Sequence, residues 1–304
     1  MKDRTEARER SRGLFNITVT PFGADGAIDE AALTASIERV LAFGYDGLLI
    51  GGIYGEFPTL SPAERASLFH RVMAVVGDRV PVLLCCAASD TRVVRELTGL
   101  ASELGGLPMI TAPYASEVTD DHLAAFFGAI AGLSRTGIMI YNAPGIGITL
   151  SPALIERLCD IAGVVALKQG DLAPTTVDLL ANRVVGRIRV LAASDLAMLG
   201  PLAAGFDGVS STNSCALPEL IQATCRAMAE GDARRAGRLH RLWFPLRQLA
   251  RRFGQPQTTK AMMAARGWFG GAVRPPLLDL DAAQRREVAA AMAALAAEPE
   301  AGIA

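Results

Sequence analysis

A repeated pairing of a short apolar run with a helical pattern is the feature that most constrains how this chain can fold. Near-continuous apolar runs, rather than alternating ones, are expected of parallel strands whose outer face is covered by helices. Eight such units with right-handed crossovers close naturally into a barrel. The expected strands lie at residues 14–19, 47–50, 80–85, 107–111, 137–141, 164–168, 188–192 and 208–211.

Signals for helix starts agree with these boundaries. A cap residue followed by proline occurs at Ser61 and again at Ser151, and Asp29 and Asp90 stand where two further helices are expected to begin. An open doubly wound sheet is the competing fold, but it requires a G-x-G-x-x-G turn after its first strand. This chain has Thr20-Pro21-Phe22-Gly23 there instead. We therefore predict an α/β fold, a (β/α)8 TIM barrel with a C-terminal helical extension.

The chain divides into three segments of one predicted domain. Residues 1–12 are a charged N-terminal extension, expected to be solvated and partly frayed, and they lack the apolar segment of a signal peptide. Residues 13–215 are the barrel core, and residues 216–304 are helices packed on the barrel, with no linker that would make them independent. These helices are expected at 216–230, 232–252, 256–267 and 281–298.

Composition excludes several classes of partner. The net charge is -1 and the pI is near 6.3, which argues against a nucleic-acid or anionic-membrane binder. No apolar run approaches the ~18 residues of a membrane span. The five cysteines contain no C-x-x-C pair and suit free thiols in a reducing cytoplasm, and the three histidines lack metal-ligand spacing. We expect a cytoplasmic protein with no metal, membrane or nucleic-acid partner.

Two strand ends carry residues suited to carbonyl chemistry. Lys168 follows the apolar run Val164–Leu167, and Tyr141 ends the preceding strand. Consecutive strands lie ~4.8 Å apart, so a tyrosine and a lysine at matching heights bring phenol and amine together. Burial would lower the lysine pKa, and the neutral amine could attack a ketone while the phenol transfers protons. The alternatives are a rim lysine whose ammonium reaches water and an ordinary core tyrosine.

A glycine-rich turn, Gly51-Gly52-Ile53-Tyr54-Gly55-Glu56, follows the second expected strand. Small residues let backbone N–H groups approach a bound anion, which suits a carboxylate. A tight connection between two elements is the alternative.

Taken together, these strand ends resemble the dihydrodipicolinate synthase / N-acetylneuraminate lyase superfamily of class I aldolases. The order and spacing of the matches extend from about residue 14 to residue 215, and the helical tail suits the family too. The matching stretches are Val19-Thr20-Pro21-Phe22, Gly44-Tyr45-Asp46-Gly47, Gly52-Ile53-Tyr54-Gly55-Glu56, Leu60-Ser61-Pro62-Ala63-Glu64-Arg65, Ala112-Pro113-Tyr114, Ile140-Tyr141-Asn142-Ala143-Pro144 and Leu167-Lys168.

The resemblance implies that Lys168 is the Schiff-base lysine and Tyr141 the general acid/base. It also implies that one turn holds the carboxylate of pyruvate or a larger 2-oxo acid. No metal or organic cofactor is then needed, because the covalent imine on Lys168 is itself the electron sink. Members are commonly dimers of dimers, so a homotetramer is expected. The implied carboxylate turn is Gly52–Glu56, and the candidate substrate-binding residues within it are Gly52, Ile53, Tyr54 and Gly55.

The chain departs from the synthase pattern at three places. Ile53-Tyr54 replaces two threonines, and Ala115 replaces a second tyrosine that reaches a neighbouring subunit's site. Ile146 stands where the synthase has an arginine, and it cannot make a guanidinium's bidentate bonds to a second carboxylate. We therefore do not expect lysine-biosynthetic synthase activity. A substrate with a neutral or sugar-like tail is favoured, and Tyr54 could stack on that tail or hydrogen-bond to it.

Two polar clusters fall where relatives that bind sugar acids contact substrate hydroxyls. They are Ser194-Asp195 and Ser210-Ser211-Thr212-Asn213, from which Asp195 and Ser211 are taken as candidate substrate-binding residues. Each has a structural alternative, because Asp195 could cap the short helix that follows and the serines could satisfy turn backbones.

The resulting hypothesis is a class I lyase that acts on a small-molecule 2-oxo acid. From the enamine, either cleavage or formation of the C3–C4 bond, or dehydration of a 2-oxo-3-deoxy sugar acid, remains open. Three alternatives stay beside it: the synthase activity for which the family is named, a catalytically silent paralogue that binds a 2-oxo acid, and a phosphosugar-binding barrel. The last would want a glycine-rich phosphate cup, and the run from Ser210 to Asn213 lacks the glycines.

Overall fold

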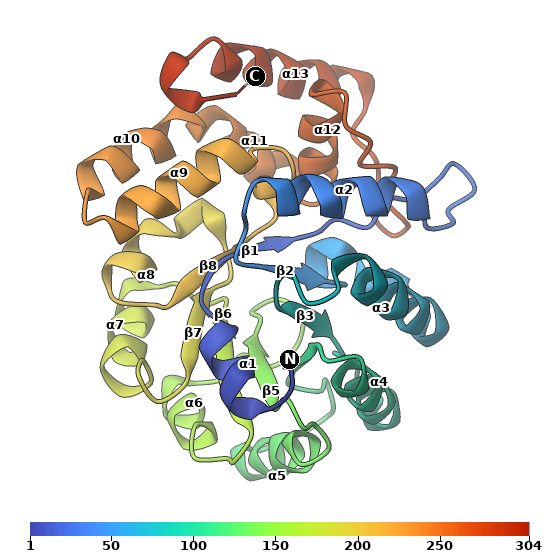
Figure 1. Ribbon diagram of the computed structural model, residues 1–304, viewed down its shortest axis with the longest axis vertical. Helices are drawn as coiled ribbons and strands as arrows, with labels where there is room; N and C mark the ends of the chain where they lie inside the picture. The colour runs from blue at the N-terminus through green and yellow to red at the C-terminus, as the bar shows by residue number, and fades with distance from the viewer. Residues whose placement is uncertain (304) are drawn as a thin grey trace. The chain divides into compact units, whose positions relative to one another are not determined.

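A computed structural model describes residues 1–303, and in it eight strands form a closed barrel (Figure 1). The strands follow one another around the barrel in chain order, and the pairs from the second strand to the eighth are parallel. The predicted (β/α)8 architecture is confirmed. The strands are β1 (Gly13–Ile17), β2 (Gly47–Ile50), β3 (Val82–Cys85), β4 (Leu107–Thr111), β5 (Ile138–Asn142), β6 (Val164–Gln169), β7 (Arg189–Ala192) and β8 (Gly208–Ser211).

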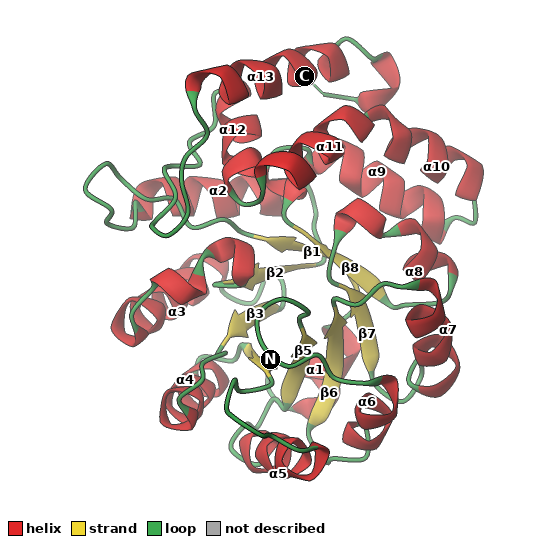
Figure 2. Ribbon diagram, turned by 180° about the vertical axis from the view of Figure 1, so that it is seen from behind, coloured by secondary structure: helices red, strands yellow, loops and turns green. Residues whose placement is uncertain are grey.

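The first of two compact units comprises Met1–Phe15, Asp46–Ile50 and Pro62–Ser210. Its helices are α1 (Arg4–Arg10), α3 (Pro62–Val76), α4 (Thr91–Glu103), α5 (Asp120–Ala131), α6 (Pro152–Leu158), α7 (Pro174–Arg183), η3 (Asp195–Ala197) and α8 (Leu199–Ala203). Figure 2 shows α4, α5 and α6 outside the strands of this unit. Strands β3 to β6 are buried along their whole length, which explains their near-continuous apolar sequences.

The predicted helix starts in this unit are confirmed: α3 begins at Pro62, and α4 and α6 have the predicted caps. The Arg92 N–H donates to the Asp90 carboxylate (2.9 Å) at the start of α4. The Leu154 N–H donates to the Ser151 hydroxyl (3.2 Å), with Pro152 as the first residue of α6. These caps satisfy N–H groups that have no partner within the helix.

The second unit comprises residues 16–45, residues 51–61 and the chain from residue 211 onwards. Asp29 is confirmed as the cap of its first helix, since its carboxylate accepts the Ala32 N–H (2.8 Å). The helices of this unit are α2 (Glu30–Ala42), η1 (Ile53–Gly55), η2 (Phe57–Thr59), η4 (Asn213–Cys215), α9 (Pro218–Ala229), α10 (Ala233–Leu242), α11 (Phe244–Phe253), α12 (Gln257–Ala265), α13 (Ala282–Ala296) and η5 (Pro299–Ala301).

The single helix predicted for residues 232–252 is wrong. The structure has two helices there, because α10 ends at Leu242 and α11 begins at Phe244. Pro245 lies in the first turn of α11, where a residue without an N–H is tolerated, whereas it would break the middle of a longer helix. Trp243, at the junction, is fully buried.

The prediction of a frayed N-terminal extension is also wrong. Residues 4–10 form α1, and Ala7 on this helix is fully buried. The N-terminal ammonium donates to the Gly105 carbonyl (2.6 Å), and the Arg4 guanidinium donates to the Ala131 carbonyl (3.1 Å). The charged side chains concealed this packing, because a single buried alanine gives no periodic apolar signal. The division at residues 12 and 215 stays a prediction.

We expect Ala7→Leu to destabilise the protein by about 1–3 kcal/mol, because extra methylenes at a filled site force neighbouring groups apart. Glu9→Leu adds a leucine to an exposed position of the same helix and is the matched control. Urea unfolding of the two variants checks this expectation. Equal midpoints for both would show that α1 does not pack against the rest of its unit.

Candidate active site

Lys168 is the fifth residue of β6 and is held inside the protein. Every residue of this strand is buried, and the lysine itself is 1% exposed. The alternative of a rim lysine with its ammonium in water is therefore wrong. A side chain of this length is rarely buried to this degree unless its charge is paired or its pKa shifts.

Tyr141 faces Lys168 from the neighbouring strand. The two residues are direct partners in the parallel pairing of β5 with β6. The lysine Nζ lies 3.6 Å from the centroid of the Tyr141 ring, and the tyrosine is 6% exposed. The predicted juxtaposition of the two side chains is confirmed, with the amine lying over the face of the ring.

Burial changes the charge state of this amine. Desolvation lowers the pKa of Lys168 to about 7, and the Cys85 thiol at the end of β3 opposes the shift weakly. The same burial raises the pKa of Cys85 itself, while Arg65 and Lys168 act in the other direction. Near neutral pH a large share of Lys168 is therefore the uncharged amine, which is the nucleophilic form.

A pair of buried amides fixes the ends of β5 and β6. The Asn142 side-chain amide donates to the Gln169 side-chain oxygen (3.1 Å), and its own oxygen accepts the Leu150 N–H (2.9 Å). Asn142 and Gln169 follow Tyr141 and Lys168 directly, so this bond holds the two strand ends in register. We did not predict a role for Gln169. Its position at the end of an apolar strand could have indicated this role, because a buried polar side chain needs a hydrogen-bond partner.

The turn after β6 leaves no room for a side chain. The Gly170 N–H donates to the Asn142 carbonyl (2.8 Å), and a Cβ at Gly170 would lie 2.7 Å from that oxygen and 2.8 Å from Pro144. Glycine at this position therefore allows the two strand ends to approach each other. The same unit holds Ile146, half-buried in the turn after β5, and Ala115, exposed after β4.

Asp195 begins the short helix η3 after β7 and is 3% exposed. It is not the helix cap, because the Leu196 N–H donates to the Ser194 hydroxyl (3.2 Å). Its suggested capping role is therefore wrong. A buried carboxylate at the carboxyl end of a barrel strand remains a candidate for binding substrate hydroxyls.

Ser211 belongs to the second unit and satisfies turn backbone. Its hydroxyl accepts the Ser214 N–H (3.0 Å), its carbonyl accepts the Ser214 hydroxyl (2.8 Å), and it is fully buried. The structural alternative is therefore confirmed for this residue. Its contact with substrate stays a prediction.

The glycine-rich turn is a tight helical turn of the second unit. Ile53, Tyr54 and Gly55 form η1, and the Gly55 N–H donates to the Gly52 carbonyl (3.0 Å). The Thr20 hydroxyl donates to the Gly55 carbonyl (2.7 Å), and a Cβ at Gly55 would lie 3.2 Å from the Thr18 carbonyl. The turn is compact and fixed. Its grouping with Lys168 in one site stays a prediction.

The described part of the chain offers no cluster of three or more His, Cys, Asp or Glu suited to a metal ion. The five cysteines form no disulfide in the described part of the chain. Among residues 1–303, the helices fall short of the length and hydrophobicity that a bilayer crossing requires.

A buried lysine with a lowered pKa at the carboxyl end of a barrel strand is suited to Schiff-base chemistry. The model of the dihydrodipicolinate synthetase family matches residues 10–295. The chain belongs to this family and is a lyase.

Curated relatives cover nearly the whole chain. A 4-hydroxy-tetrahydrodipicolinate synthase of Sorangium cellulosum is 35% identical over 294 residues, which is 95% of this chain and 97% of the relative. The 4-hydroxy-tetrahydrodipicolinate synthase 1 of Streptomyces coelicolor is 35% identical over 288 residues, or 92% of each chain.

Solved structures share the fold. A chloride-inhibited dihydrodipicolinate synthase of Acinetobacter baumannii, in complex with pyruvate, has a TM-score of 0.88 at 25% identity, covering 96% of this chain and 99% of that one. A dihydrodipicolinate synthase of Agrobacterium tumefaciens has a TM-score of 0.89 at 25% identity, covering 95% and 99%.

We expect the reactivity of Lys168 to level off near pH 7. The pKa of about 7 means that the uncharged fraction increases about tenfold per pH unit below that point and little above it. Reductive methylation with formaldehyde and cyanoborohydride between pH 5 and 10, followed by peptide mass measurement, reports this profile. Exposed Lys2 is the internal reference for the reagent. A Lys168 rate that still increases steeply above pH 9 would contradict the prediction.

Lys168→Met should stabilise the protein in a pH-dependent way. The folded pKa of about 7 lies below the ordinary lysine value of ~10.4, so the unfolded chain gains a proton first as the pH falls. The wild type therefore loses stability from pH ~10.4 down to 7, on the order of several kcal/mol in total, and methionine removes that loss. Urea midpoints at pH 6, 8 and 10 measure the difference. A stability gain that does not change with pH would exclude a depressed pKa.

Proposed function

We propose that Lys168 is the nucleophile of a class I lyase and forms a Schiff base with C2 of pyruvate or a larger 2-oxo acid. The observation that carries the proposal is the buried amine, 3.6 Å from the ring centroid of Tyr141, whose pKa lies near neutrality. An amine of this kind attacks a ketone without a metal or organic cofactor. The covalent imine then supplies the electron sink.

The proton transfers are assigned to Tyr141. Attack of the Lys168 amine on C2 gives a carbinolamine, and loss of water from it requires a proton on the departing hydroxyl. A phenol beside the amine can donate that proton and later accept one. For condensation, loss of a proton from C3 of the iminium gives an enamine, whose C3 forms the bond to the second substrate. For cleavage, the C3–C4 bond of the iminium breaks, its electron pair gives the same enamine, and the enamine then takes up a proton at C3. The position of Tyr141 directly opposite Lys168 in the β5–β6 register supports this role.

Recognition of the 2-oxo acid is assigned to the turn formed by Gly52, Ile53, Tyr54 and Gly55. The turn is compact, and small residues in a turn of this kind let backbone N–H groups approach a carboxylate, which supports the assignment. Buried Asp195 is the candidate for binding a substrate hydroxyl. Ser211 is assigned to substrate binding through the turn that its hydroxyl stabilises.

Residues around the turn after β5 favour a neutral or sugar-like tail on the substrate. Ile146 is half-buried there and offers no charge to a second carboxylate. Aldol cleavage or condensation and dehydration of a 2-oxo-3-deoxy sugar acid are both compatible with the proposed enamine. We propose that the protein is a homotetramer and acts in the cytoplasm.

4-Hydroxy-tetrahydrodipicolinate synthase activity is the second candidate. The names of the curated relatives support it, at 35% identity over nearly the whole chain. Ile146 and Ala115 argue against this activity, because they replace the arginine and the second tyrosine of the synthase pattern. A silent paralogue that binds a 2-oxo acid is the third candidate.

Borohydride reduction in the presence of pyruvate tests the nucleophile. We expect one adduct per chain, located on Lys168 by peptide mass measurement, and none in Lys168→Ala. Tyr141→Phe should still form the adduct, but about 10²–10⁴-fold more slowly, because general acid–base catalysis is lost. Absence of an adduct with pyruvate and with a panel of 2-oxo sugar acids would refute the Schiff-base assignment.

Condensation of pyruvate with aspartate semialdehyde separates the first two candidates. We expect turnover to be weak in the wild type and to increase in Ile146→Arg, which restores a guanidinium for the second carboxylate. Ile146→Met, a neutral replacement of similar size, is the matched control. Robust wild-type turnover would establish the synthase activity instead.

A further inference from the structure

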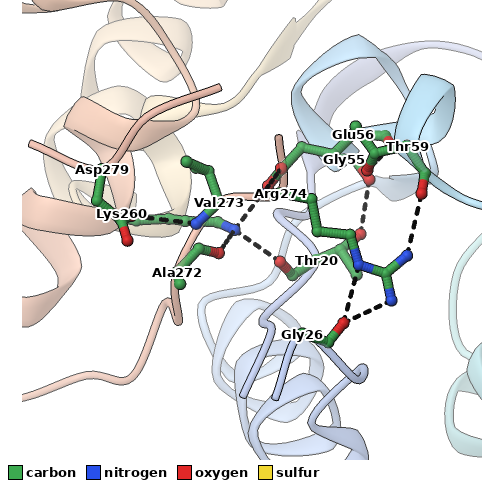
Figure 3. Close-up of polar contacts among 10 residues, drawn as sticks. All are labelled: Thr20, Gly26, Gly55, Glu56, Thr59, Lys260, Ala272, Val273, Arg274 and Asp279. Atoms are coloured by element: carbon green, nitrogen blue, oxygen red, sulfur yellow. Dashed lines mark hydrogen bonds and ion pairs between the residues drawn. The ribbon is translucent and has the colours of Figure 1, made fainter. Parts of the chain in front are cut away.

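A buried ion pair lies directly behind the carboxylate turn of the second unit (Figure 3). Lys260 of α12 and Glu56, the residue that closes the turn, are 4% and 1% exposed. The Lys260 ammonium donates to the Glu56 carboxylate (2.6 Å), to the Thr20 carbonyl (2.8 Å) and to the Ala272 carbonyl (2.6 Å). The three N–H bonds of the ammonium are thus all used.

The second oxygen of Glu56 is bound as well. It accepts the backbone N–H of Arg274 (2.9 Å). The guanidinium of the same residue donates to the Gly26 carbonyl (2.6 Å) and to the Thr59 carbonyl (3.0 Å). Figure 3 shows the Arg274 guanidinium between the carbonyls of Gly26 and Thr59. The carboxylate is therefore fixed at both oxygens.

This network holds a backbone conformation that glutamate seldom adopts. Glu56 has a φ of 60° in the left-handed region, between η1 and η2. Such a conformation costs about 1–3 kcal/mol for a non-glycine residue and persists where surrounding contacts impose it. The Glu56 N–H donates to the Ile53 carbonyl (3.1 Å), so the strained residue closes the turn that Ile53 opens.

Lys260 also contacts Thr20, a second residue that holds the turn in place. It binds the carbonyl of Thr20, whose hydroxyl donates to the Gly55 carbonyl. One ammonium therefore stabilises the turn from two sides, through Glu56 and through Thr20. Desolvation lowers the pKa of Lys260, and the Glu56 carboxylate opposes this and favours the charged form.

Stability alone gives little reason to keep such a pair. Replacing a buried ion pair with apolar residues of similar size is often neutral or stabilising, because desolvation offsets the attraction. Its attested use is to specify one arrangement among several. Here that arrangement is the conformation of the turn.

We propose that Glu56 and Lys260 are positioning residues that set the conformation of the Gly52–Gly55 turn for the carboxylate of the 2-oxo acid. This inference rests on the proposed function, in which that turn binds the carboxylate. Neither residue needs to touch the substrate. The pair should affect affinity for the carboxylate and leave the reaction at Lys168 intact.

The test variant is the double substitution Glu56→Gln with Lys260→Met, which removes both charges together. The matched control is Glu219→Gln with Arg266→Met. That pair also lies in the second unit, makes two charge-assisted bonds (2.7 and 2.9 Å), and joins α9 to the residue that caps α12. Urea unfolding of both variants gives their stabilities, and Glu56→Gln alone is measured as a milder change.

The readout is the concentration of ligand that gives half-maximal borohydride trapping on Lys168. For the test variant we expect an increase of about tenfold or more with pyruvate, a loss typical of a misplaced hydrogen bond to a charge, with the adduct yield at saturation unchanged. Methyl pyruvate, which lacks the charge, should change less than twofold. The control variant should change neither ligand.

Two results would overturn the proposal. One is a folded test variant, or a folded Glu56→Gln variant, with wild-type half-saturation for pyruvate. The other is an increase in the half-saturating concentration that is equal for pyruvate and methyl pyruvate, or that also occurs in the control variant. Either increase would indicate a general packing effect. Absence of any adduct in the wild type is a different result, because it overturns the proposed function and the positioning role with it.

Discussion

Burial of one amine inside a parallel barrel is the constraint on which the candidate active site depends. A lysine side chain on β6 can stay buried if it gives up its charge, because an isolated ammonium in an apolar interior is far more costly than a neutral amine. The four residues that precede it on β6 are apolar, and desolvation is the largest cause of its lowered pKa, opposed by Cys85. The fold itself therefore favours the uncharged form of Lys168, because the burial of β6 inside the barrel also lowers the pKa of this lysine.

The chain contains a second buried lysine with the opposite electrostatic setting. Lys260 lies within bonding distance of a carboxylate and two carbonyls, so its charge is compensated. Lys168 faces an aromatic ring instead. Desolvation lowers the pKa in both cases, but only Lys260 has a carboxylate that favours the ammonium. Similar burial therefore gives one side chain suited to attack a ketone and another suited to hold the backbone in place.

The strands could be predicted from the sequence, because burial on both faces leaves a near-continuous apolar run. The contact between Lys168 and Tyr141 could also be predicted, because the two residues lie at matching positions of adjacent strand ends. The sequence did not predict Lys260–Glu56, because 204 residues separate the partners and neither stands out from other charged residues. The break at Trp243 was open to prediction, since Pro245 is incompatible with the middle of a helix. The packing of α1 could not be predicted, because it depends on the backbone carbonyls of Gly105 and Ala131, which are distant in the sequence.

The two parts of the proposed chemistry place different demands on the protein. Lys168 must gain and lose protons during the reaction, so its setting has to leave both charge states accessible near neutral pH. A carboxylate turn must remain in one conformation while the covalent intermediates change, because its donors stabilise charge only when they need no reorganisation. A strained Glu56 held at both oxygens meets that demand. The proposed chemistry thus uses two buried lysines differently: the charge of Lys260 is compensated by its partners, whereas Lys168 exchanges its proton near neutral pH.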